Sequence, residues 1–184
     1  MNGGFRQINV IMNLGVADYD GLQTTIGYRG GRKLNASLSY TLSKATNTSE
    51  PDGNGINPNE ANIAALGEQE RGPSLLDQRH RAVLNVSYRL PFNITAGTVS
   101  QFASPRPFNS TTGVDNNGDR ANNDRPVING VVVGKSAFRG TTISDVSLFA
   151  EGRLKMSGRT VLLRVEGFNV FNHANIFARN ATYG

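Results

Sequence analysis

Several residue types and patterns that usually point to function are missing from this 184-residue sequence. It contains no Cys and no Trp, and only two His. Without Cys, disulfide scaffolds, thiolate zinc sites and cysteine nucleophiles are excluded. Apolar residues make up 38% of the chain, below the share of about 45–50% that is usual for globular domains.

Long hydrophobic runs are also absent. The longest apolar run, residues 63–66, has four residues, which excludes a transmembrane helix. A secretory signal peptide is not evident, because the stretch 8–14 is short and is broken by Asn9 and Asn13. We therefore expect either that the protein stays inside the cell or that Met1 is not its true N-terminus.

Turn-forming residues and basic charge are abundant instead. Gly and Asn each occur 21 times, and the formal net charge is +5. A basic net charge is a feature of proteins that bind nucleic acid. However, the 19 Lys and Arg are spread along the sequence without a basic cluster, so we expect no nucleic-acid binding.

Apolar and polar residues alternate without an error over residues 34–43, as in a β-strand with one apolar and one polar face. Residues 22–29 repeat the pattern, and Gly30, Gly31 and Arg32 between the two segments predict a hairpin turn. If Arg29 pairs with Lys33, the two apolar faces coincide.

Two more hairpins follow from the same pattern. The second joins residues 81–90 to 94–102 through a turn at 91–93. The third joins 146–154 to 161–167 through a turn at 156–159, and pairing Lys155 with Thr160 sets Glu151 opposite Arg164. Phe149, Leu162 and Phe168 interrupt the polar face of this hairpin.

Short and long connections alternate strictly, because these turns are separated by the long segments 44–78 and 104–142. Outer-membrane barrels have short periplasmic turns and long extracellular loops. The polar face would then line a lumen, the apolar face would meet lipid, and Tyr28, Tyr88 and Tyr40 would belong to interfacial girdles. A soluble antiparallel β-sandwich, for example a carbohydrate-binding module, is the alternative.

A series of short motifs in fixed order adds to this interpretation. In chain order they are residues 40–44 (YTLSK), 71–74 (RGPS), 77–81 (DQRHR), 90–92 (LPF), 107–108 (PF), 115–119 (DNNGD), 123–126 (NDRP) and 166–173 (EGFNVFNH). Together they resemble the C-terminal barrel region of TonB-dependent outer-membrane receptors, closest to the Oar-like type with a carboxypeptidase-regulatory-like N-terminal domain. The resemblance covers about residues 19–177.

The resemblance implies an all-β, antiparallel up-and-down barrel of 22 strands around an N-terminal plug, with uptake driven by the TonB complex. Residues 1–184 would supply six or seven strands, without the plug or the final strand, so we expect a fragment. It also implies outer-membrane lipid and lipopolysaccharide, the plug and the TonB complex as partners. No enzymatic activity and no cofactor are expected.

Individual site candidates are weak. Asp115, Asn117 and Asp119 begin like a calcium loop, but Pro126 stands where the bidentate Glu belongs, so a polar turn is the simpler interpretation and no metal site is expected. His80 and His173 lack the partners that catalysis needs, and Ser74 does not fit a nucleophile.

Structural roles are expected for the remaining candidates. Asp77, Arg79 and Arg81 are expected to form an ion-pair cluster where loop and barrel meet. Arg81, Arg89 and Arg164 fall on the lumen face. A short helix, capped by Asn57 and ending at Gly67, is predicted within the first long connection.

Overall fold

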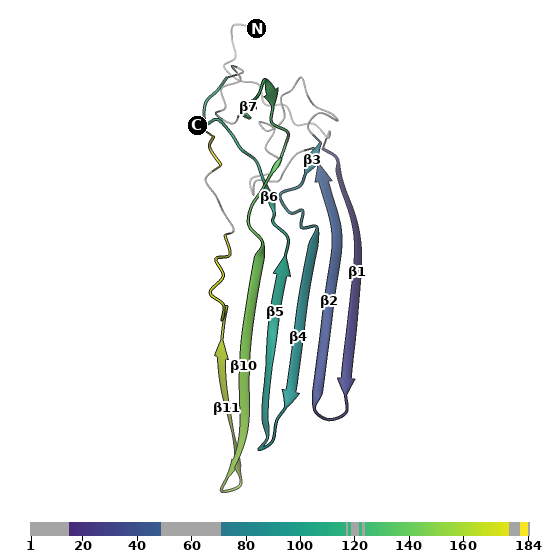
Figure 1. Cartoon of the computed structure of the whole chain (residues 1–184), viewed down its shortest axis with the longest axis vertical. Helices are drawn as coiled ribbons and strands as arrows, with labels where there is room; N and C mark the ends of the chain where they lie inside the picture. The colour runs from purple at the N-terminus through teal and green to yellow at the C-terminus, as the bar shows by residue number, and fades with distance from the viewer. Residues whose placement is uncertain are drawn as a thin grey trace, which may run out of the picture.

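The computed structural model describes residues 15–48, 71–116, 118, 122, 124–176 and 181–183. Its main feature is one antiparallel sheet in which six long strands follow one another in chain order (Figure 1). These strands are β1 (Ala17–Gly30), β2 (Leu34–Asn47), β4 (His80–Arg89), β5 (Ile94–Ala103), β10 (Ile143–Met156) and β11 (Arg159–Gly167). The predicted all-β, up-and-down arrangement is confirmed.

Short strands lie at the end of the sheet that carries the long connections. The strand β3 (Gly72–Pro73) pairs with the end of β2, and two small ladders lie within the second long connection. The paired strands of these ladders are β6 (Pro107–Phe108) with β9 (Phe138–Arg139), and β7 (Val127–Ile128) with β8 (Val131–Val132). The predicted helix at 57–67 lies outside the described residues.

The register of the first hairpin differs from the predicted one by two residues. Arg29 lies opposite Asn35 rather than Lys33, and Tyr28 lies opposite Ala36. The turn begins one residue later than expected, since Gly31 has a φ of 61° and Gly30 remains in the strand opposite Leu34. A shift of two residues leaves every side chain on its predicted face, because side chains alternate with a period of two.

The other two hairpins form where they were predicted, and the third also has the predicted pairing. In the second, Phe92 and Asn93 both have positive φ, and the Leu90 N–H donates to the Ile94 carbonyl at 2.8 Å. In the third, Lys155 lies opposite Thr160 and Ser157–Gly158 make the turn. Both turn residues have positive φ (47° and 74°), as the two-residue turns that match strand twist require.

No second layer of described residues covers the apolar face of the sheet. Among the described residues, Ala103 and Ile143 are the only buried hydrophobic ones. Ile26 on β1 is 64% exposed and Val165 on β11 is 74% exposed. A soluble sandwich would bury this face against a second sheet, so the alternative architecture is not what the chain forms.

The longest strands extend beyond the length needed to cross a bilayer. The strands β1, β2 and β10 each have 14 residues, whereas β4, β5 and β11 have 10, 10 and 9. About 9–11 residues suffice for a tilted transmembrane strand. Within the described ranges, no helix is both long and apolar enough to span a membrane.

The first residues of β10, at the end with the long connections, are paired by the irregular segment that follows β11. After β11 ends, the Val170 N–H donates to the Val146 carbonyl at 2.9 Å. Further along, the Asn175 side chain accepts from the Ser144 N–H at 2.8 Å and donates to the Ser144 carbonyl at 3.0 Å. An amide side chain thus replaces the backbone partner that a strand would supply.

Candidate functional site

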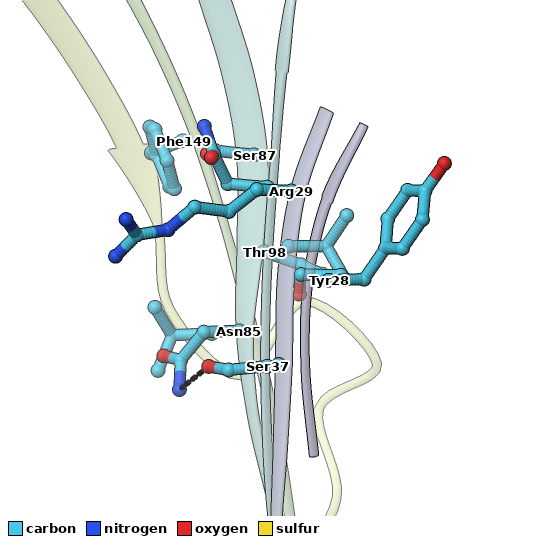
Figure 2. A pocket seen from close by; sticks show the side chains of 12 residues that line it. Tyr28, Arg29, Ser37, Asn85, Ser87, Thr98 and Phe149 are labelled. Atoms are coloured by element: carbon cyan, nitrogen blue, oxygen red, sulfur yellow. Dashed lines mark hydrogen bonds between the residues drawn. The ribbon is translucent and has the colours of Figure 1, made fainter. Parts of the chain in front are cut away.

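The polar face of the sheet lines an open hollow of about 870 Å³ near the short turns. Figure 2 shows Arg29, Asn85 and Ser87 on one side of the strands, whereas Tyr28 points to the other side. Asn35 and Ser37 of β2 line the same hollow, and the Asn85 amide donates to the Ser37 hydroxyl at 3.5 Å. The predicted lumen face is therefore hollowed, and the apolar side chains of Val99 and Phe149 line it together with the polar ones.

An aromatic ring and a guanidinium lie together on this face. The Arg164 guanidinium carbon is 4.7 Å from the centre of the Phe149 ring. Arg164 also donates to Glu151 at 3.2 Å, as the predicted cross-strand pair requires, and to Glu166 on its own strand at 2.6 Å. Both carboxylates on this part of the face are thus engaged by one arginine.

Phe149 breaks the alternation in the sequence because it has a specific place on the polar face. It lies opposite Gly97 of β5, and a Cβ added at Gly97 would come within 2.7 Å of its ring. A large ring over a strand glycine covers backbone that would otherwise be exposed. Phe149 is therefore an apolar residue on the lumen face, and the assignment of the two faces of β10 is unchanged.

Tyrosines mark both ends of the apolar face. Near the short turns, Tyr28 lies over Gly30, and Tyr88 is 42% exposed. Near the long connections, the Tyr40 hydroxyl and His80 Nδ1 are 2.7 Å apart, and their rings stack with centroids 6.2 Å apart. These positions fit the predicted girdles, and the Tyr40–His80 contact across β2 and β4 was not anticipated.

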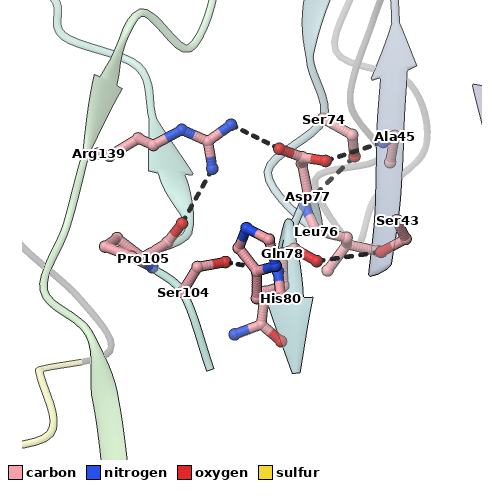
Figure 3. A network of polar contacts seen from close by, with 10 residues as sticks. All are labelled: Ser43, Ala45, Ser74, Leu76, Asp77, Gln78, His80, Ser104, Pro105 and Arg139. Carbon is pink, nitrogen blue, oxygen red and sulfur yellow. Dashed lines mark hydrogen bonds and ion pairs between the residues drawn. The ribbon is translucent and has the colours of Figure 1, made fainter. Parts of the chain in front are cut away.

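The junction of strands and long connections centres on Asp77 (Figure 3). Its side chain is 2% exposed, accepts from the Ala45 N–H at 2.8 Å and pairs with Arg139 at 2.5 Å. Arg139 also donates to the Pro105 carbonyl at 3.0 Å. One carboxylate therefore joins the two long connections to the end of β2.

The predicted ion-pair cluster is corrected by this geometry. Arg79 and Arg81 are both exposed, and within the described part of the chain neither makes an ion pair with Asp77. The partner is Arg139, 62 positions away in the sequence. Asp77 and Arg79 precede β4, which begins at His80, so the period of a strand does not place their side chains beside that of Arg81.

Other polar side chains are buried at the same junction. Lys135 is 4% exposed and donates to the Asn47 side chain at the end of β2. Ser136 is 1% exposed, and its N–H donates to the Asn109 side chain at 2.7 Å. Buried polar groups that satisfy one another specify a single arrangement, so the described parts of the long connections form an ordered cap on this end of the sheet.

The remaining site candidates have local roles. The Asp115 side chain accepts from the Gly118 N–H at 2.7 Å, which is a turn contact, whereas Asn117 and Asp119 lie outside the described residues. His173 Nε2 lies 3.1 Å from the Thr142 carbonyl oxygen. The Asn169 side chain accepts from the His173 N–H and donates to the His173 carbonyl, both at 3.0 Å. Within the described ranges, no cluster of His, Asp and Glu could hold a metal ion.

A single meandering sheet with a lipid-type apolar face, a polar hollow and capped long connections defines a wall of a membrane β-barrel. Comparison with protein families agrees, since residues 1–144 match the model of the outer membrane beta barrel domain. The chain belongs to this family, and its place is the bacterial outer membrane. No curated protein and no solved structure matches it.

Proposed function

We propose that the chain is part of the barrel wall of a TonB-dependent outer-membrane transporter of the Oar-like type, and that it is not an enzyme. One observation carries the proposal: two of the motifs that resemble this receptor type, residues 40–44 and 77–81, meet where the strands join the long connections. The Ser43 hydroxyl donates to the Gln78 carbonyl at 3.0 Å, and the Tyr40 hydroxyl lies 2.7 Å from His80 Nδ1. Pro126 of the NDRP motif is fully buried.

In this proposal the two faces have separate partners. The apolar face meets outer-membrane lipid and, on the side of the long connections, lipopolysaccharide. The hollow polar face surrounds the N-terminal plug and the path of the substrate. The ordered cap would hold the long extracellular connections in the positions that receive the substrate from outside.

Binding to TonB tests this proposal. The complete protein would be purified from outer membranes, and binding of the isolated periplasmic domain of TonB would be measured by surface plasmon resonance. Saturable binding that is lost when the N-terminal TonB-contacting segment of the complete protein is deleted is expected. A folded, complete protein without such binding would show that the barrel serves another outer-membrane function.

A further inference from the structure

The topology gathers basic residues that are scattered in the sequence. All three short turns lie at one end of the sheet (Figure 1). The turns and the adjoining strand ends carry seven cations and, over residues 27–36, 86–97 and 152–162, no Asp or Glu. We call this group the basic mouth. Its members are Arg29, Arg32, Lys33, Arg89, Arg153, Lys155 and Arg159.

These cations are exposed and are not neutralised by the described part of the chain. No ion pair or side-chain hydrogen bond with another described residue involves any of them. On β10 and β11, the carboxylates of Glu151 and Glu166 both pair with Arg164 instead. Seven unpaired positive charges at one end of the sheet repel one another, and an anionic partner would relieve that repulsion.

Strand parity directs most of this charge to the lumen. Arg29, Arg89, Arg153 and Lys155 alternate with apolar-face residues in the observed registers, so they lie on the polar face. Figure 2 shows the Arg29 side chain on the same side of the strands as Asn85, and Tyr28 on the other side. Anionic phospholipid would meet the opposite face, so the position of these residues favours a partner that enters the lumen.

The spacing of the charges favours an extended partner. Neighbouring strands are about 4.8 Å apart, so Arg29 on β1 and Arg153 on β10, four strand spacings apart in the sheet, are separated by at least roughly 19 Å. A single phosphate cannot reach both, whereas a chain that carries several carboxylates can. Arginine also binds carboxylates through two parallel hydrogen bonds.

We propose that the basic mouth binds an acidic polypeptide segment at the periplasmic end of the barrel. The proposal depends on the outer-membrane orientation, in which the short turns face the periplasm, and not on TonB-dependent transport. Loss of TonB binding and loss of this interaction are therefore separate outcomes.

The test uses the protein purified from outer membranes in a neutral detergent. Binding of a short fluorescent peptide of Glu-Gly-Ser repeats would be measured by anisotropy, with the Gln-Gly-Ser peptide as the neutral probe. Only the Glu peptide should bind, and raising NaCl from about 0.05 to about 0.5 M should weaken binding at least about tenfold.

Two triple variants locate the interaction. Replacing Arg29, Arg89 and Arg153 by Gln should weaken binding of the Glu peptide about tenfold. The control variant K44Q/R79Q/R106Q removes the same charge from exposed residues at the opposite end and should bind as the unchanged protein does. Circular dichroism of both variants checks that each is folded.

Three results would overturn the proposal: no binding of the Glu peptide, equal weakening by both triple variants, or binding that ignores salt. A lipid partner is tested in parallel with vesicles containing phosphatidylglycerol. If the R29Q/R89Q/R153Q variant loses contact with labelled phosphatidylglycerol while peptide binding is unchanged, the basic mouth serves the membrane and not a polypeptide.

Discussion

At the residue scale, large aromatic rings on this sheet pair with glycines. Tyr28 lies over Gly30 on the apolar face, and Phe149 lies over Gly97 on the polar face. A strand glycine leaves its backbone uncovered, and a ring beside it restores the contact that a side chain would have made. Phe149 and Gly97 are distant in sequence, so alternation alone cannot reveal that pair.

Asp77 provides the sharpest test at this scale. D77A leaves the Ala45 N–H and the Arg139 guanidinium without their acceptor, so we expect the free energy of unfolding to fall by about 2–3 kcal/mol. This loss is smaller than that expected for a fully buried ion pair, because the Arg139 side chain is 39% exposed. Urea unfolding of the complete protein folded into lipid vesicles, followed by far-UV circular dichroism, measures the change.

The matched control is E166A on the polar face. Glu166 belongs to an exposed ion pair with Arg164, and exposed pairs contribute little to stability because solvent screens them. If D77A costs no more than E166A, the Asp77 contacts do not hold the cap to the barrel.

At the element scale, the strands were predictable because each carries its face in its own sequence. The ten alternating residues at 34–43 identify β2 without help from any partner. The register of the first hairpin was less certain, since adjacent glycines at 30 and 31 allow the turn to begin at either. Asp77 and Arg139 could not be paired in advance, because folding of two long connections brings them together.

Facing of the strands is tested by two adjacent substitutions in β2. Leu38 lies opposite Ile26 and Leu84 on the apolar face, and Ser39 lies opposite Thr25 on the polar face. L38R should lower the free energy of unfolding by about 2–4 kcal/mol near mid-bilayer, because the charge would enter lipid. S39R should cost little, because its charge would enter the polar hollow.

Both variants would be unfolded by urea in vesicles of one lipid composition. Each variant is compared with the unchanged protein under the same conditions, so the difference between the L38R and S39R losses does not depend on the absolute free energy of unfolding. Equal losses for L38R and S39R would mean that the two faces meet similar surroundings, and the lumen assignment would then be wrong.

At the scale of the whole molecule, polarity follows the membrane axis as well as the two faces. The end with long connections holds buried, mutually paired polar groups such as Asp77 with Arg139 and Lys135 with Asn47. The end with short turns holds exposed cations, and residues 27–36, 86–97 and 152–162 around these turns include no Asp or Glu. At the end with long connections, the polar groups thus bind one another within the chain. At the end with short turns, the positive charge is available to a partner.

The barrel itself makes the last prediction. In a closed barrel every strand is hydrogen-bonded on both sides and no sheet edge is left, so SDS should not unfold the complete protein at room temperature. Samples from outer membranes should therefore migrate differently in SDS gels before and after boiling. The R29Q/R89Q/R153Q variant should show the same shift, because its changes remove charge from exposed residues and break no strand pairing. A single mobility before and after boiling, in a sample whose circular dichroism shows folded β-structure, would contradict a closed barrel.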